Sequence, residues 1–266
     1  MGRPIRIGAI QAIAAGPHVS RKRGARPSGS ALCNVVAVLV VAESGIQAKR
    51  ILSRWSRPDD AGSGRAAPAI QRRRELGRAV LRKLLVEVAH VAPLHCRFGV
   101  EPEGRPCIRA ANSRRPTWIS LSHSRGWLAG ALSTNAAIGI DLEYHKPDRD
   151  FAALASAAFG PQERRLVEGG GATEFYRIWT LREAMAKALG IGLGLVTDGR
   201  DHVTPNAVEA RNWYFDHSEP VPGFSLAVVF ARRKPGRSRQ NLLSRVSGHK
   251  RGHAPKIMYL ISPFSP

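Results

Sequence analysis

Apolar positions recur along this chain with both the helical and the strand period, so the sequence predicts a mixture of helices and short strands. An uninterrupted apolar run predicts a buried strand at 35–42, and an apolar stripe flanked by arginines predicts a long amphipathic helix at 69–88. Further helical patterns lie at 151–158, 161–167 and 173–189. A glycine loop at 168–171 separates the last two, and Gly190 ends the final helix.

Short apolar or alternating segments predict additional strands. They lie at 96–100, 118–122, 127–132, 136–142, 208–215 and 224–231. A hairpin is expected around 133–135, so 118–143 should form three neighbouring strands. The order strand, long helix, short strands occurs before residue 135 and again after it. This repetition suggests two α+β halves.

Most of the net charge of +21 comes from the two ends of the chain. Hydrophobic residues (43%) and charged residues (23%) are as frequent as in ordinary soluble domains. Residues 1–30 contain six Arg or Lys and residues 231–266 contain nine, and neither segment contains an acidic residue. We therefore expect disordered basic termini at 1–30 and 232–266, around a mildly basic middle that suits a phosphate-bearing ligand or an acidic protein.

The sequence lacks the motifs that are typical of several protein classes. The three cysteines have no CxxC spacing and the nine histidines form no HExxH pattern. No Walker loop, dinucleotide Gly-x-Gly-x-x-Gly or Gly-x-Ser-x-Gly elbow is present. The longest apolar run, 35–42, is far shorter than the roughly 20 residues of a membrane span. We expect a cytoplasmic protein that does not contact a membrane.

Four charged residues in two segments carry the candidate chemistry. Asp141 and Glu143 lie two apart in an apolar strand, so their side chains share one face. Glu183 and Lys187 lie one turn apart on a helix and also share a face. Three carboxylates beside one ammonium group are the composition of a site that holds a divalent hard cation against a phosphate.

Each part also has a purely structural explanation. The two acids would be inert if their strand ended at the surface. Thr180 and Glu183 match a capping box, and Lys187 has the spacing of a simple i+4 ion-pair partner of Glu183. None of these explains why an apolar strand carries two acids. Ser122 and His123, after another strand, offer a hydroxyl and an imidazole to a phosphate.

Four motifs together resemble the Sfp-type 4'-phosphopantetheinyl transferases. They are Gly104-Arg-Pro106, Ser120-Leu-Ser-His-Ser124, Gly139-Ile-Asp-Leu-Glu143 and Trp179-Thr-Leu-Arg-Glu-Ala-Met-Ala-Lys187. The resemblance implies an α+β fold, a pseudo-dimer of two similar α+β subdomains, here 31–135 and 136–231, with the metal site in the second. It also implies transfer of 4'-phosphopantetheine from coenzyme A to a serine of an apo acyl or peptidyl carrier protein.

The resemblance further implies roles for individual residues. Mg²⁺ would be held by Asp141, Glu143 and Glu183. Coenzyme A would be bound by Arg73, Arg105, Pro106, Ser122, His123 and Lys187. Glu183 and Lys187 would be catalytic, and the choice between Glu183 and a metal-bound water as the base stays open.

Some positions depart from the family pattern. Arg105 and Arg182 stand where lysine is usual, Ser120 stands where asparagine is common, and the first 70 residues match only at 35–42. Two alternatives therefore stay open. One is a basic protein that binds nucleic acid non-specifically through its ends, and the other is an inactive homologue that binds coenzyme A without transfer. In all cases we expect a monomer.

Overall fold

The computed structural model describes residues 35–61, 66–88, 96–101, 105–110, 117–134, 136–204, 213–231 and 256–261. The helices are α1 (Ile46–Trp55), α2 (Pro68–Val88), α3 (Phe151–Ala158) and α4 (Pro161–Leu189), with 3-10 turns η1 (Pro58–Ala61) and η3 (Gly192–Leu195). The strands are β1 (Val35–Ala42), β2 (Cys96–Val100), β3 (Pro106–Ala110), β4 (Trp118–Ser124), β5 (Trp127–Ser133), β6 (Ile138–Tyr144), β7 (Trp213–Ser218), β8 (Phe224–Ala231) and β9 (Lys256–Ile261).

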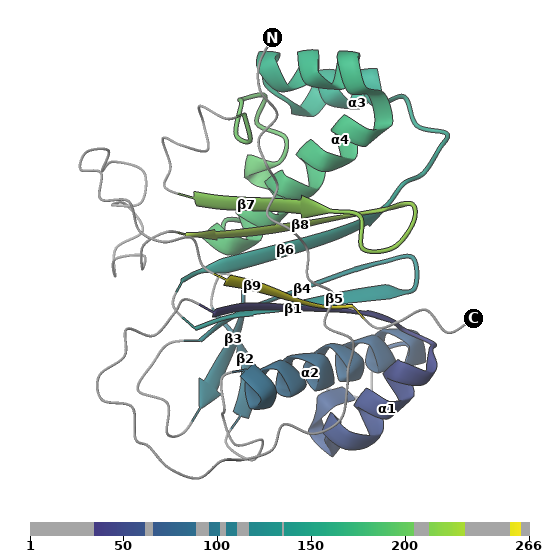
Figure 1. Ribbon diagram of the computed structural model, residues 1–266, viewed down its shortest axis with the longest axis vertical. Helices are drawn as coiled ribbons and strands as arrows, with labels where there is room; N and C mark the ends of the chain where they lie inside the picture. Colours follow the sequence, from purple (N-terminus) through teal and green to yellow (C-terminus); the bar gives the residue numbers. More distant parts are fainter. Residues whose placement is uncertain are drawn as a thin grey trace, which may run out of the picture.

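Two sheets lie between two layers of helices, with α1 and α2 on one outer side and α3 and α4 on the other (Figure 1). The larger sheet has the order β2-β3-β4-β5-β1-β9 and the smaller one the order β6-β8-β7. All pairs are antiparallel except β1 with β9. The architecture confirms the predicted α+β class, whereas the similarity of the two halves as a pseudo-dimer stays a prediction.

The apolar run of β1 reflects its central place in this arrangement. Val36, Val38 and Val40 belong to the core between the two sheets. Leu39 and Val41, which alternate with them, pack with the buried face of α2. A strand that is covered on both faces has no polar side to alternate with, so its sequence is continuously apolar.

The predicted hairpin around 133–135 is wrong. Strand β5 pairs with β4 on one edge and with β1 on the other, whereas β6 pairs with β8 in the other sheet. Because both edges of β5 already have partners, no edge is left for β6. The chain instead crosses from one sheet to the other between β5 and β6, which places β6 at an edge of the smaller sheet.

Other predicted elements are mostly confirmed, with three omissions. Helix α1 and strands β3 and β9 were not predicted. Strand β9 contradicts the prediction that the whole segment after residue 231 is a tail, because its backbone pairs in parallel with β1. The rest of both basic ends, and residues 208–212 of the predicted strand 208–215, lie outside the described residues.

The predicted glycine loop at 168–171 is a kink between two helical segments, which α4 includes together, so the break lies at Gly171 and not over the whole loop. Helix α4 continues through residues 168–170 and leaves helical geometry at Gly171, where φ is 58° and ψ is −140°. Its C-terminal cap is Gly190 in the left-handed conformation, as predicted. Among the described residues, every helix is too short or too polar to serve as a membrane span.

Gly139 lets α4 lie directly against β6. A Cβ atom at this position would stand 1.8 Å from the carbonyl oxygen of Ala184, so a larger residue would push the helix away. The close approach places the second half of α4, which carries Glu183 and Lys187, beside the strand that carries Asp141 and Glu143.

Candidate functional site

The site is centred on a contact between α4 and β6. The Lys187 ammonium nitrogen donates hydrogen bonds to Asp141 Oδ1 at 2.6 Å and to the Ile140 carbonyl oxygen at 3.1 Å. A third bond reaches the Ser122 hydroxyl at 3.2 Å. Asp141 is only 4% exposed, so the explanation by an inert, solvated strand end is wrong for this residue.

The two structural explanations for the helix motif are also wrong. Thr180 lies in the interior of α4, and its hydroxyl donates to the Tyr176 carbonyl oxygen at 2.8 Å, so it does not cap a helix start. The ion pair of Lys187 joins it to Asp141 on another element. Lys187 of the helix motif therefore contacts the acidic strand rather than Glu183 on its own helix.

The three carboxylates share one electrostatic environment. Burial raises the pKa of Glu183 to about 7, and the negative charges of Asp141 and Glu143 add to the shift, while Lys187 opposes it. Burial also raises the pKa of Glu143, and the charge of Asp141 contributes in the same direction. The charge of Asp141 therefore disfavours the ionised forms of Glu143 and Glu183, which a bound cation would relieve.

The donor set is compatible with a hard cation, although it is not assembled as a ligand cage. Asp141 Oδ2 is buried and has no hydrogen-bond partner in the described part of the chain. Carboxylate oxygens are the ligands that Mg²⁺ takes in proteins, usually together with several waters. No group of three His, Cys, Asp or Glu side chains among the described residues is arranged to hold a metal ion, so Mg²⁺ binding stays a prediction.

A cavity of about 300 Å³ opens beside these groups. Its lining residues come from the start of β3, from β4, and from the second half of α4 and the segment after it, and they are Arg105, Pro106, Ile119, Ser120, Leu121, Glu183, Ala186, Lys187, Gly190 and Gly192. The cavity thus brings the predicted ligand residues Arg105 and Pro106 together with Glu183 and Lys187. Arg105 is held by an ion pair with Glu101 at 2.6 Å.

Two of the other predicted coenzyme A residues, Arg73 and Ser122, already have partners within the protein. Arg73 forms an ion pair with Glu43 at 2.9 Å. Burial lowers the pKa of His123, and the charges of Arg73 and Lys187 lower it further while that of Glu43 opposes them, so the imidazole lies within the electrostatic range of both cations. The Ser122 hydroxyl is buried and bonded within the protein, so its contact with a phosphate stays a prediction, as do those of Arg73 and His123.

Sequence reasoning missed the part played by Arg182, the neighbour of Glu183. Its side chain is fully buried and pairs with the fully buried Glu163 at 2.5 Å. The Glu163 carboxylate in turn accepts hydrogen bonds from the amides of His202 at 2.7 Å and Val203 at 2.8 Å. This pair fixes α4 against the segment that follows it, and an arginine on the apolar face of the helix is the signal that would have revealed it.

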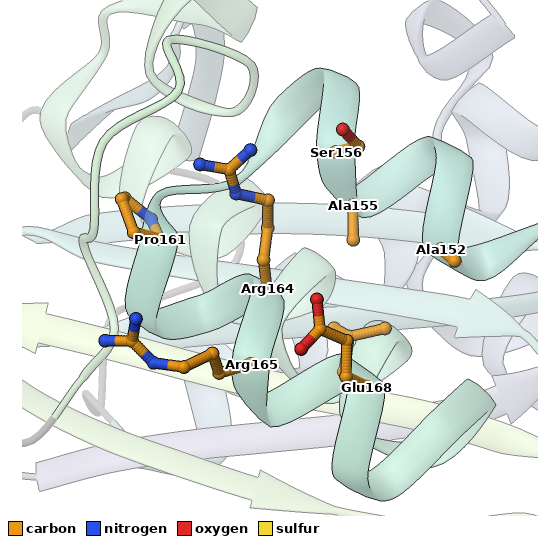
Figure 2. A pocket seen from close by; sticks show the side chains of 8 residues that line it. Ala152, Ala155, Ser156, Pro161, Arg164, Arg165 and Glu168 are labelled. Atoms are coloured by element: carbon orange, nitrogen blue, oxygen red, sulfur yellow. The ribbon is translucent and has the colours of Figure 1, made fainter.

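A second cavity, of about 290 Å³, lies away from the acidic strand. It lies between α3 and the first half of α4, before the bend at Gly171, and Figure 2 shows Arg164, Arg165 and Glu168 extending from α4 around it. None of the predicted site residues lines it. We therefore locate the candidate active site in the first cavity.

Known proteins are similar in sequence to this region. Residues 137–224 match the model of the 4'-phosphopantetheinyl transferase superfamily, a range that includes both acidic motifs. The 4'-phosphopantetheinyl transferase HetI of a Nostoc species is 33% identical over 52% of this chain and 60% of its own length. The 4'-phosphopantetheinyl transferase AcpT of Salmonella typhimurium is 34% identical over 43% of this chain and 59% of its own length.

A third relative matches over a longer part. The 4'-phosphopantetheinyl transferase ffp of Bacillus subtilis is 27% identical over 59% of this chain and 73% of its own length. The chain spans less than two thirds of the HetI and AcpT proteins that it matches. These similarities confirm the resemblance that the four motifs predicted.

Proposed function

We propose that this protein transfers the 4'-phosphopantetheine group from coenzyme A to a serine of an apo acyl or peptidyl carrier protein, in a reaction that depends on Mg²⁺. The observation that carries the proposal is the convergence of Lys187 from α4 with Asp141 from β6, beside Glu183 and the cavity lined by Arg105. The names of the matched relatives support the same reaction.

Asp141, Glu143 and Glu183 would hold the metal ion, which when bound supplies positive charge to the diphosphate of coenzyme A. Lys187 contributes a second positive charge at a fixed position, because Asp141 and the Ile140 carbonyl oxygen orient its ammonium group. Arg105 lies at the cavity wall, where its guanidinium suits the phosphates of the same ligand.

The chemical step replaces the phosphoanhydride bond of the diphosphate with a phosphate ester bond to the carrier serine. The hydroxyl oxygen of the carrier serine forms a bond to the β-phosphorus, and the bond from that phosphorus to the bridging oxygen of the diphosphate breaks. The leaving group is adenosine 3',5'-bisphosphate, and the serine proton passes to a base in the site. Glu183 is the carboxylate in the cavity lining, which makes it our candidate for that base over a water molecule.

The test is incubation of the purified protein with coenzyme A, Mg²⁺ and several apo carrier proteins from fatty-acid, polyketide and peptide synthesis, followed by mass spectrometry of the carriers. We expect a mass gain of one phosphopantetheine arm on at least one carrier. The same carrier with its target serine replaced by alanine serves as the control. No mass gain on any carrier would contradict the proposal and favour an inactive homologue that binds coenzyme A.

The alternative of non-specific nucleic-acid binding rests on the charge of the two ends, which lie mostly outside the described residues. A full-length protein in which the Arg and Lys residues of 1–30 and 232–255 are replaced by Gln, which keeps strand β9, should lose nucleic-acid binding and keep transferase activity if both exist. The expected monomeric state and cytoplasmic location also stay predictions.

A further inference from the structure

Strands β4 and β6 belong to different sheets, yet side-chain hydrogen bonds join them along their length. Three backbone amides of β6 donate to three serine hydroxyls of β4, each at 3.1 Å: Ile140 to Ser120, Leu142 to Ser122 and Tyr144 to Ser124. We call Ser120, Ser122 and Ser124 the serine ladder. Its members recur with period two, so all three side chains lie on the face of β4 that looks toward β6.

The serine ladder provides hydrogen-bond acceptors for the backbone amides of an edge strand. Strand β6 pairs with β8 on one side only, so the amides on its other side need acceptors. The serine hydroxyls supply acceptors where a neighbouring strand would have supplied carbonyl oxygens. These hydrogen bonds therefore fix the register between β4 and β6, in addition to the apolar packing between the two sheets.

Two of the three serines make a second bond that the third does not make. A serine hydroxyl has one proton to donate, and each of these oxygens already accepts an amide hydrogen. Ser122 donates its proton to Asp141 Oδ1 at 2.8 Å, and Ser124 donates its proton to Glu143 Oε2 at 3.1 Å. At the equivalent place beside Ser120 the strand carries Gly139, which has no carboxylate.

Glu143 depends on the hydrogen bond from Ser124 more than Asp141 depends on that from Ser122, because its carboxylate has fewer partners in the described part of the chain. Asp141 is also fixed by Lys187 at 2.6 Å. For the Glu143 carboxylate, the Ser124 hydroxyl is the one hydrogen-bond partner among the residues that the structure describes. Without it, the longer glutamate side chain would be free to turn away from the like charge of Asp141.

We propose that Ser124 is a positioning residue, whose hydroxyl ties the Glu143 carboxylate to the register between the two sheets and so holds it in the metal site. The proposal rests on the metal assignment within the proposed function. It extends that assignment to a residue outside the acidic set, and it makes the junction of the two sheets part of the site.

The experiment compares four full-length proteins: wild type, S124A, S124T and S120A. Binding of Mn²⁺, a paramagnetic substitute for Mg²⁺, is measured by electron paramagnetic resonance, and thermal unfolding is measured in parallel. S120A is the matched control, because it removes a ladder hydroxyl that bonds an amide but no carboxylate. We expect about tenfold weaker Mn²⁺ binding for S124A, affinity close to wild type for S120A and S124T, and similar losses of thermal stability for the two alanine variants.

Three results would overturn the proposal: S124A with wild-type affinity for Mn²⁺, S120A with a loss equal to that of S124A, or a wild-type protein that binds no Mn²⁺. The carrier-modification assay separates this proposal from the proposed function. If the wild type modifies a carrier and the S124A variant binds Mn²⁺ as tightly as the wild type, the positioning role alone is refuted. A tenfold loss in S124A, in a protein that modifies no carrier, would refute the transferase and keep the positioning role.

Discussion

The buried ion pair between Arg182 and Glu163 offers the sharpest test of how the site helix is held. Both side chains are 0% exposed, and the Arg182 guanidinium also donates to the Arg200 carbonyl oxygen at 3.0 Å and to Asp198 at 3.1 Å. The substitution R182M keeps a long apolar stem and removes the charge. It leaves the Glu163 carboxylate in a place from which water is excluded.

The size of the effect follows from this burial. Removing one partner of a buried ion pair destabilises a protein by about 3–5 kcal/mol, because the remaining charge is uncompensated. The matched control is R177M, on the same helix. Arg177 pairs with Glu174 at 2.8 Å, but both side chains are 29% exposed, so solvent screens the pair. We expect a loss of at most about 1 kcal/mol for this control.

The assay is urea unfolding followed by circular dichroism at pH 7, with thermal unfolding as a second measurement. A loss of about 4 kcal/mol corresponds to a decrease in Tm of roughly 10 °C for a chain of this size. Adding E163Q to R182M removes the unpaired charge and should recover about 1–3 kcal/mol. The reasoning fails if R182M loses no more stability than R177M, or if E163Q in the R182M background gives no recovery.

Three further predictions concern the site and the acid range. D141A should lower carrier modification by at least about 100-fold, because it removes both a proposed metal ligand and the partner that orients Lys187. The control D148A, at an exposed position, should retain activity in the same mass assay. E183Q should also abolish transfer. In the absence of metal at pH 8 it should raise the free energy of unfolding by about 1–3 kcal/mol, because it removes a negative charge that burial, and then the repulsion from Asp141 and Glu143, make unfavourable. A less stable E183Q protein in urea unfolding would contradict this reasoning. Burial lowers the pKa of His217 from 6.5 to about 4, so the folded protein binds fewer protons than the unfolded chain and its stability is lost as the pH falls through this range, by up to about 3 kcal/mol. Urea unfolding at pH 7 and pH 4.5 should show a smaller loss for H217Q than for wild type, and equal losses would refute the assignment.

The local pattern of the sequence was sufficient for most elements. The continuous apolar run of β1 and the stripe of α2 correctly predicted a buried strand and a long helix, because burial on one or two faces dictates the period of apolar residues. The glycine at 190 ended α4 as predicted, because it adopts the left-handed conformation that other residues rarely take. The two acidic motifs also include Asp141 and Lys187, which the structure brings into contact, while the roles of these residues stay predictions.

The partners of those elements required the tertiary structure. Strand β6 follows β5 in the chain, yet it pairs with β8, because both edges of β5 are occupied by β1 and β4. Which edges remain free depends on how the whole sheet assembles, and a local pattern carries no information about that. Strand β9 was missed for the same reason, since it pairs with β1 from the far end of the chain.

The order of residues along the chain was enough to show the candidate groups: two acids at strand spacing, and an acid and a lysine at helix spacing. Their contacts depend on how distant segments pack. Lys187 has the spacing to pair with Glu183 but bonds Asp141, since the glycine at 139 lets the helix lie directly against the strand. Three serines of one sheet accept hydrogen bonds from the backbone of the other, and two of them also donate to the acids of the strand. Spacing restricts which side chains share a face, whereas packing between distant segments decides which charges meet.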